Sequence, residues 1–270
     1  MILFPNAKIN LGLRILNKRE DGFHNIESCL YPIPIYDILE ILPSSKTNFE
    51  FTGSDLSISE KDNLCFKAWE KLSKRHKLKG IHLHLHKIIP HGAGLGGGSS
   101  DAAFTLKAID ELYDLRINNE LIEISSRLGS DCPFFVRNQV QIAKGKGDLL
   151  SDFKLDLSDY FGLIVKPDFS ISTAEAYSLV KPKSTGDSIE KLLKQNPENW
   201  KAELMNDFEI YLEERYPELK RIREMLYQQG AIYASMSGSG SAYFGIFKTN
   251  PELISLNFPD KYFVRSFAFN

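Results

Sequence analysis

The sequence has few cysteines, and their spacing excludes two classes of small protein. Its 270 residues include three cysteines, Cys29, Cys65 and Cys132, and no Cys-x-x-Cys pair. An odd number of widely separated cysteines argues against a disulfide framework and against a zinc site, and it indicates reduced thiols. We therefore expect a cytoplasmic protein.

The sequence also lacks an excess of one charge and lacks long apolar runs. The formal net charge is −2 and the pI is about 6.3, whereas nucleic-acid binders carry a basic face. No run of 18 apolar residues occurs, and the start Met1–Pro5 is too short for a signal peptide. We expect no nucleic-acid partner, no membrane partner, and a monomer or weak homodimer.

The composition that is present suits a globular protein, with 43% hydrophobic and 25% charged residues. A chain of this length forms one large domain or two of ordinary size. Charge and helical patterning change near residue 150, so we predict an N-terminal domain at residues 1–150 and a C-terminal domain at residues 151–270.

Hydrophobic periodicity predicts alternating strands and helices. The predicted strands are 7–16, 37–42, 48–52, 80–88, 161–166, 243–247 and 262–267. The predicted helices are 64–76, the segment after residue 100, 119–128, 188–194, 200–214 and 217–229. We expect Asp62 or Asn63 to cap the first helix, Ser99 or Ser100 to cap the second, and Gly129 to end the third.

Residues 80–88 alternate strictly between aliphatic and histidine side chains. His82, His84 and His86 would share one face of this strand. Three histidines in a row suggest metal ligands, but no carboxylate or cysteine accompanies them. An exposed polar face is the favoured interpretation.

The strongest local signal is the segment 90–100, PHGAGLGGGSS, in which five of eleven residues are glycine. Glycine adopts positive φ at low cost and lets backbone N–H groups approach a ligand closely. Because the segment lies between a predicted strand and a predicted helix, these N–H groups and the helix dipole would form an anion site suited to phosphate. A flexible loop without a ligand is the alternative.

Two common phosphate loops do not fit this segment. A Walker A loop needs a lysine after its glycines, and none follows here. The dinucleotide pattern G-x-G-x-x-G is met by Gly92, Gly94 and Gly97, but it also requires a second strand ending in an acid about 20 residues later. That region, 110–114, falls inside the predicted helix.

The segment resembles the central motif of the GHMP kinase superfamily. In that superfamily the loop wraps the phosphates of ATP, and a serine at the helix start helps to hold Mg²⁺. The resemblance implies ATP and Mg²⁺ as cofactors and no dedicated metal cage, with Ser99 or Ser100 as a metal ligand. It implies ATP-binding roles for Pro90, Gly92, Ala93, Gly94, Leu95, Gly96, Gly97, Gly98, Ser99 and Ser100, and for Asn63 and Lys87 near the adenosine.

Four further motifs extend the resemblance over most of the chain. They are AKINLGL at 7–13, REDGFH at 19–24, LGSDCPFF at 128–135 and MSGSGS at 236–241. Within the superfamily, the DGFH tetrapeptide in this order resembles the family that phosphorylates a hydroxyl of 4-diphosphocytidyl-2-C-methyl-D-erythritol in non-mevalonate isoprenoid biosynthesis. The resemblance implies a two-domain α+β fold with the active site in the cleft between the domains.

The resemblance also implies the catalytic residues. Asp131 would accept the proton of the substrate hydroxyl, and Lys8 would keep that carboxylate ionised and offset charge on the transferred group. The residues alone leave open a helix cap for Asp131 and a solvated strand lysine for Lys8.

A cytidine-diphosphate substrate would be held by a further group of residues. In the family an aromatic residue at Phe23 stacks on cytosine, the histidine at His24 reads its polar edge, and an aromatic at Tyr177 stacks on the other side. A core position is the alternative for Tyr177. The remaining predicted substrate-binding residues are Asn10, Thr173, Gly238 and Ser239.

Two rival functions follow from the same motifs. The first is another GHMP kinase activity, on homoserine, mevalonate or a sugar. The second is a nucleotide-binding regulator on the kinase fold, but a regulator would need neither Lys8 nor Asp131.

Overall fold

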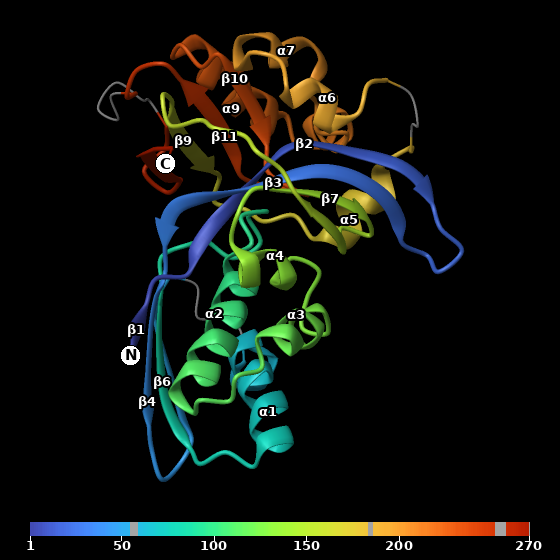
Figure 1. The fold of residues 1–270 in the computed structure, drawn as a ribbon. Helices are drawn as coiled ribbons and strands as arrows, with labels where there is room; N and C mark the ends of the chain where they lie inside the picture. The colour runs from blue at the N-terminus through green and yellow to red at the C-terminus, as the bar shows by residue number, and fades with distance from the viewer. Residues whose placement is uncertain (55–58, 183–185, 252–257, 270) are drawn as a thin grey trace. The chain divides into compact units, whose positions relative to one another are not determined.

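The computed structural model describes residues 1–54, 59–182, 186–251 and 258–269, which form two compact units of strands and helices (Figure 1). Unit 1 comprises residues 1–7, 35–91 and 96–139, and unit 2 comprises residues 8–34, 92–95 and 140–270. The last change of unit along the chain falls between Gln139 and Val140. A domain boundary at residue 150 stays a prediction.

Unit 1 is built on a four-stranded sheet with the strand order β1-β4-β6-β5. Its strands are β1 (Ile2–Leu3), β4 (Ile38–Pro43), β5 (Asn48–Gly53) and β6 (Ile81–Lys87). Strand β4 is antiparallel to β1 and to β6, whereas β5 runs parallel to β6. The predicted alternation in β6 is confirmed, because its aliphatic side chains are buried and its histidines are only partly exposed.

The three histidines of β6 face residues of β5. The Asn48 amide is hydrogen-bonded to His82, and the Thr52 hydroxyl to His84 and to His86. The parallel register of the two strands places Asn48 opposite His82 and Thr52 opposite His86. Within the described residues, no three His, Cys, Asp or Glu side chains are arranged to hold a metal ion.

The helices of unit 1 cover one face of this sheet (Figure 1). They are α1 (Leu64–His76), α2 (Gly97–Leu112), α3 (Asn118–Ser126) and α4 (Cys132–Arg137), with a 3₁₀ turn η1 (Glu60–Asp62) before α1. Apolar side chains of α1 and α2, such as Leu72 and Leu106, pack with Leu39 and Leu83 of the sheet. The predicted cap of α1 is confirmed: Asn63 accepts a hydrogen bond from the Cys65 N–H.

Two predicted helix ends in unit 1 are wrong. Helix α2 begins at Gly97 with Gly96 as its N-cap, at φ 72°, so Ser99 and Ser100 lie inside its first turn. Helix α3 ends at Ser126, before Gly129. The N–H groups of Arg127 and Leu128 donate hydrogen bonds to carbonyls three residues earlier, as in a 3₁₀ turn, and these bonds close the last turn of the helix.

Unit 2 contains two four-stranded sheets, with the strand orders β2-β3-β7-β8 and β10-β11-β9-β12. The first sheet consists of β2 (Asn6–Lys18), β3 (His24–Tyr36), β7 (Gln141–Gly145) and β8 (Leu149–Asp152). The second consists of β9 (Phe161–Lys166), β10 (Tyr233–Met236), β11 (Tyr243–Phe247) and β12 (Phe263–Ala268), and its neighbouring strands are all antiparallel.

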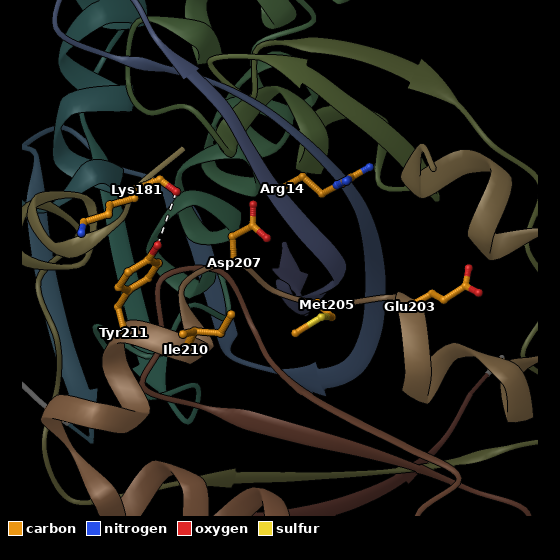
Figure 2. A pocket seen from close by; sticks show the side chains of 7 residues that line it. All are labelled: Arg14, Lys181, Glu203, Met205, Asp207, Ile210 and Tyr211. Atoms are coloured by element: carbon orange, nitrogen blue, oxygen red, sulfur yellow. Dashed lines mark hydrogen bonds between the residues drawn. The ribbon is translucent and has the colours of Figure 1, made fainter. Parts of the chain in front are cut away.

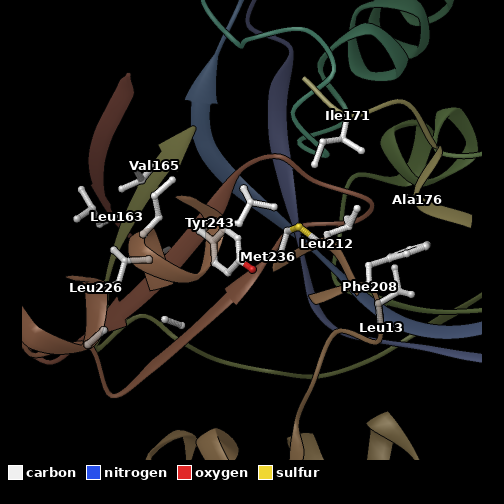
Figure 3. Close-up of a cluster of buried hydrophobic side chains, with 14 of the residues drawn as sticks. Leu13, Leu163, Val165, Ile171, Ala176, Phe208, Leu212, Leu226, Met236 and Tyr243 are labelled. Carbon is white, nitrogen blue, oxygen red and sulfur yellow. The ribbon is translucent and has the colours of Figure 1, made fainter. Parts of the chain in front are cut away.

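Helices and an apolar cluster complete unit 2. The helices are α5 (Thr173–Leu179), α6 (Ile189–Leu193), α7 (Trp200–Glu203), α8 (Glu209–Arg215) and α9 (Pro217–Gln228), with a 3₁₀ turn η2 (Pro197–Asn199). Figure 3 shows the cluster, in which Val165 of β9 and Tyr243 of β11 pack with Leu212 of α8 and Leu226 of α9. Among the helices of the described residues, none is long and apolar enough to cross a membrane.

The predicted continuous helix at 200–214 is wrong, because tertiary contacts interrupt it. Leu204 is extended, at φ −84° and ψ 92°, and helix α7 stops there. The Leu13 N–H of β2 donates to the Met205 carbonyl, and the Asp207 N–H donates to the Leu13 carbonyl. Pairing with a distant strand has therefore replaced helical hydrogen bonds over residues 204–208.

Candidate active site

The glycine-rich loop has the backbone that its composition predicts. Gly92, Gly94 and Gly96 all have positive φ, at 60°, 74° and 72°. A Cβ on Gly94 would lie 1.9 Å from the Ser237 carbonyl oxygen, so a side chain cannot fit there. The loop leads directly into α2, whose first N–H groups have no acceptor within the helix. Such a helix start favours an anion.

Lys8 is buried, with 3% of its surface exposed, so the alternative of a solvated strand lysine is wrong. Its ammonium donates to the Asn10 side-chain oxygen and, at 2.9 Å, to the Gly94 carbonyl. The Ser237 hydroxyl donates to the same carbonyl at 2.8 Å. The structure thus brings together three predicted site elements of unit 2: the AKIN strand, residues 92–95 and the MSGSGS loop.

Asn206 holds the MSGSGS loop in place, and the sequence analysis did not single it out. Its side-chain amide donates two hydrogen bonds of 2.8 Å, to the carbonyls of Met236 and Gly238, and its oxygen accepts from the Phe208 N–H. Asn206 is fully buried. It stands inside an apparently helical pattern, which gave no signal of this role.

Two predicted cytosine-binding residues lie together in unit 2. The rings of His24 and Tyr177 stack with centroids 4.9 Å apart and an interplanar angle of 19°. Tyr177 also meets Phe208 edge-on. Burial, with a smaller effect from Lys18, lowers the pKa of His24. Phe23 instead lies 60% exposed, with the Lys146 ammonium 5.1 Å from its ring centre.

The remaining predicted substrate-binding residues of unit 2 also lie close to one another. The hydroxyls of Thr173 and Ser239 are hydrogen-bonded at 3.2 Å. A Cβ on Gly238 would lie 3.3 Å from the Asn10 side-chain oxygen. Asn10 in turn donates to the Ser28 hydroxyl at 2.9 Å, which fixes the orientation of its amide.

Asp131 belongs to unit 1 and directly precedes α4. Its side chain makes no capping hydrogen bond to this helix, so the alternative role as a helix cap has no support in the geometry. The neighbouring segment lies beside the first turn of α2, since a Cβ on Gly129 would be 3.5 Å from the Ser99 hydroxyl. Burial raises the pKa of the Cys132 thiol to about 12, and a hydrogen bond with Ser99 opposes this shift.

A pocket of unit 1 contains four of the predicted ATP-binding residues. Its lining consists of Phe51, Ser54, Asp62, Asn63, Leu64, Lys87, Ile89, Pro90, His91, Gly98 and Asp101. Apolar side chains such as Phe51, Leu64 and Ile89 meet polar ones here, and small-molecule sites combine the two kinds in this way. The structure therefore brings Asn63, Lys87, Pro90 and Gly98 around one cavity.

Lys87 lies at this pocket between two buried carboxylates, Asp37 and Asp101, which the sequence analysis did not assign to the site. Its ammonium is paired with Asp37 and lies 2.6 Å from an Asp101 oxygen. Burial would lower the pKa of Lys87, but the two carboxylates outweigh it and raise that pKa. Burial acts on Asp101 too and raises its pKa, although the Lys87 charge opposes this shift.

Comparison with known proteins identifies the family. The family model "GHMP kinases N terminal domain" matches residues 63–139, and "GHMP kinases C terminal" matches residues 184–263. A Cytophaga hutchinsonii protein named 4-diphosphocytidyl-2-C-methyl-D-erythritol kinase is 48% identical over 95% of this chain and 96% of its own length. This chain belongs to the GHMP kinase family.

Solved structures agree with this assignment. A crystal structure of 4-(cytidine 5'-diphospho)-2C-methyl-D-erythritol kinase superposes with a TM-score of 0.80 and 32% identity, covering 91% of this GHMP kinase and 89% of that chain. The Methanococcus jannaschii mevalonate kinase superposes with a TM-score of 0.70 at 17% identity, covering 99% and 96%. The second match shows the fold alone. The α+β GHMP kinase fold that the motifs predict is confirmed, and GHMP kinases use ATP as the phosphate donor.

The two serines proposed for Mg²⁺ differ in accessibility in this GHMP kinase. Mg²⁺ takes oxygen ligands and is often bound largely by substrate phosphates. Ser99 is partly exposed in the first turn of α2, so its hydroxyl fits a metal ligand at the phosphate end of the site. The Ser100 hydroxyl is enclosed and, in the part of the chain that the structure describes, has no hydrogen-bond partner. Ser99 is therefore the better candidate.

A second pocket of this GHMP kinase lies in unit 2 and contains none of the predicted site residues. It is lined by Arg14, Lys181, Glu203, Met205, Asp207, Ile210 and Tyr211, and Figure 2 shows these side chains. The Tyr211 hydroxyl donates to the Lys181 carbonyl at 3.5 Å, and Asp207 accepts from the Ile15 N–H at 2.7 Å. Its polar groups thus serve partly to join segments of unit 2.

Proposed function

We propose that this GHMP kinase transfers the γ-phosphoryl group of ATP to a hydroxyl of 4-diphosphocytidyl-2-C-methyl-D-erythritol. One observation carries the proposal: a relative named for this activity is 48% identical over 95% of the chain. The contact between His24 and Tyr177 supports the same substrate, since it brings a ring with polar nitrogens and an aromatic ring, the two kinds of group that the cytosine site needs, to one place in unit 2. The reaction belongs to isoprenoid precursor biosynthesis.

Asp131 acts in this proposal as the base that takes the proton from the attacking hydroxyl. Phosphoryl transfer passes through a loose transition state, so positioning and charge neutralisation matter more than a strongly basic group. Its place supports this role, because Asp131 follows the segment at Gly129, which lies beside the first turn of α2 and so near the proposed phosphate site.

Lys8 supplies positive charge to the transferred group. Because Lys8 is buried, water screens its ammonium less than it would screen an exposed one, so its attraction to the phosphoryl group is stronger. The hydrogen bonds to Asn10 and Gly94 fix the position of the ammonium before substrate binds. A preformed charge of this kind stabilises the transition state without reorganisation during the reaction.

The ATP site consists of Pro90 and residues 92–100 together with Asn63 and Lys87. The pocket of unit 1 takes the nucleoside, since Phe51, Leu64 and Ile89 give it apolar walls. The start of α2 takes phosphate oxygens. Mg²⁺, held by Ser99 and the phosphates, would neutralise phosphate charge when bound.

Asn10, Thr173, Gly238 and Ser239 hold the acceptor alcohol and its diphosphate, while Phe23, His24 and Tyr177 hold cytosine. His24 reads the polar edge of the base, and the lowered pKa keeps its ring neutral near pH 7, so that one nitrogen can accept and the other donate. We further propose that the enzyme works in the cytoplasm as a monomer or weak homodimer, where its three buried thiols stay reduced.

A comparison of acceptor alcohols tests the proposal. Purified protein is supplied with ATP and Mg²⁺, and ADP formation is followed with 4-diphosphocytidyl-2-C-methyl-D-erythritol, mevalonate, homoserine or galactose. We expect the cytidyl alcohol to give the highest kcat/KM by far. Faster turnover of one of the other alcohols would favour the rival GHMP kinase activities, and turnover of none would favour a regulator.

A further inference from the structure

The carboxylate of Asp37 holds both the side chain of Lys87 and the backbone that follows it. One Asp37 oxygen accepts from the N–H groups of Ile88 and Ile89, at 2.6 and 2.8 Å. The other oxygen accepts from the Lys87 ammonium. Asp37 is fully buried and lies just before β4, whereas Lys87 ends β6. The carboxylate therefore ties the end of β6 to the start of β4.

Two carboxylates take two of the three N–H bonds of the Lys87 ammonium. The second acceptor is Asp101, whose side chain is 3% exposed. An ammonium has three donors, and within the described residues no further acceptor contacts that of Lys87. Its nitrogen would lie 3.3 Å from a Cβ on Gly97, and its side chain lines the pocket of unit 1 together with Gly98.

The charge of this cluster does not suit a phosphate. One cation beside two carboxylates carries no net positive charge, whereas phosphate sites concentrate it. The cluster suits a neutral acceptor, such as a ring nitrogen or a sugar oxygen, for which a single well-directed N–H is enough. The apolar walls formed by Phe51, Leu64 and Ile89 point to the same part of the ligand.

We propose that Asp37 and Asp101 are positioning residues, which direct the third N–H of Lys87 toward the nucleoside of ATP. The inference rests on the proposed function only in taking ATP as the ligand, and it is independent of the acceptor alcohol. A lysine side chain normally loses much rotamer freedom when it binds a ligand. The two carboxylates order it in advance, which removes that cost from binding.

Asp37→Asn and Lys87→Met test the inference by ligand binding alone. Asparagine keeps an oxygen for the N–H groups of Ile88 and Ile89, but its NH₂ group replaces the acceptor of Lys87. We expect about tenfold weaker ATP binding in calorimetry for Asp37→Asn, and at least that for Lys87→Met. Inorganic tripolyphosphate, which lacks the nucleoside, should bind both variants as it binds the wild type.

The double variant distinguishes positioning from a general structural role. If Asp37 acts through Lys87, then Asp37→Asn should weaken ATP binding no further once Lys87→Met is present. Additive effects of the two substitutions would overturn the inference. So would normal ATP affinity in Asp37→Asn, or equal losses for ATP and tripolyphosphate.

Asp110→Asn is the matched control. Asp110 is a buried aspartate of the same unit that accepts from the Ile117 N–H at 3.1 Å and does not line the pocket. The Asp110→Asn variant should have a lower melting temperature than the wild type but the same affinity for ATP. If Asp37→Asn does not fold, Asp101→Asn provides the same comparison, and an unchanged ATP affinity there would overturn the inference. A wild type that binds no ATP would instead contradict the proposed function itself.

Discussion

Asp131 is the residue on which the proposed chemistry depends most. Asp131→Asn keeps the shape of the side chain but removes its ability to take a proton. Removing a general base typically lowers the rate about 10²–10⁴-fold. We expect this loss in kcat, measured by steady-state kinetics, with both substrates still bound, because the proton is transferred only in the transition state.

A helix cap at Asp131 would give a different result for the same variant. Asparagine caps a helix as well as aspartate does, so that role predicts nearly normal turnover. A kcat within a few-fold of wild type, with the chemical step shown to limit the rate, would remove Asp131 from the mechanism.

Tyr177 tests the cytosine site at the same scale. Tyr177→Ala should weaken binding of the cytidyl substrate by about 1–3 kcal/mol, the usual worth of a base stacked on an aromatic ring. ATP binding should stay unchanged, and titration calorimetry with each ligand measures both. Because Tyr177 also packs on Phe208, equal losses for the two ligands would assign it to the core instead.

The roles of single residues differ in how far they can be predicted from the sequence. Asn63 stands at a predicted helix start, and the structure confirms that it caps α1. Lys8 and Asn10 stand two residues apart in one strand motif, so they share a face and are hydrogen-bonded. Asp37 and Asn206 act through partners about 50 and 30 residues away. No local pattern encodes such pairs, so these two residues could not be predicted.

At the scale of elements, the glycine-rich loop depends on the close approach of Gly94 to Ser237. In Gly94→Ala the new methyl group would overlap the Ser237 carbonyl, and alanine at φ 74° adds strain of about 1–2 kcal/mol. We expect the loop to shift, and ATP affinity to fall more than about tenfold in calorimetry, since a displaced loop loses several charge-assisted hydrogen bonds at once.

Gly230→Ala is a control that separates backbone strain from steric overlap. Gly230 also has positive φ, at 93°, but a Cβ there meets no atom within 4 Å. This variant should lose stability while keeping the ATP affinity of the wild type. If Gly94→Ala also kept that affinity, the close approach of the two loops would have no role in nucleotide binding.

Glu209 of α8, which is hydrogen-bonded to β10, makes the free energy of unfolding depend on pH. It accepts hydrogen bonds of 2.6 Å from the Ser235 hydroxyl and the Met236 N–H, and burial raises its pKa to about 7. A carboxyl with a raised pKa binds more protons in the folded state, so its effect on stability becomes less favourable as pH rises from about 4.5 to about 7.

Glu209→Gln should remove this dependence, because the amide oxygen accepts the same hydrogen bonds without a charge. The free energy of unfolding of the variant, relative to wild type, should rise by about 3 kcal/mol between pH 4.5 and pH 7.5. Urea unfolding across this range measures it. A difference that stays constant with pH would mean that Glu209 titrates alike in the folded and unfolded chain.

Elements with a continuous local pattern were predictable, and those shaped by distant contacts were not. Strand β6 and helix α1 follow their periodicity, and Asn63 marks the start of α1. The segment 200–214 has helical periodicity too, but its hydrogen bonds with Leu13 break the helix. Helical propensity is a weak preference that such tertiary contacts override.

For the whole molecule, motif order was more informative than composition. The four motifs and the glycine-rich loop predicted the GHMP kinase fold, which the family models and the superpositions confirm. A change of composition cannot reveal that residues 8–34 pack with the C-terminal half, as the pairing of Leu13 with Asn206 requires. A change of composition along the chain therefore cannot predict compact units that are made of non-consecutive segments.

The central claim is that the enzyme phosphorylates a hydroxyl of 4-diphosphocytidyl-2-C-methyl-D-erythritol, and product analysis tests it most directly. The protein is incubated with γ-labelled ATP, Mg²⁺ and this alcohol, and the label is followed by ³¹P NMR and mass spectrometry. We predict a new phosphate monoester on the alcohol, formed in proportion to ADP, and its loss in Asp131→Asn. Release of the label as inorganic phosphate, with the alcohol unchanged, would contradict the account.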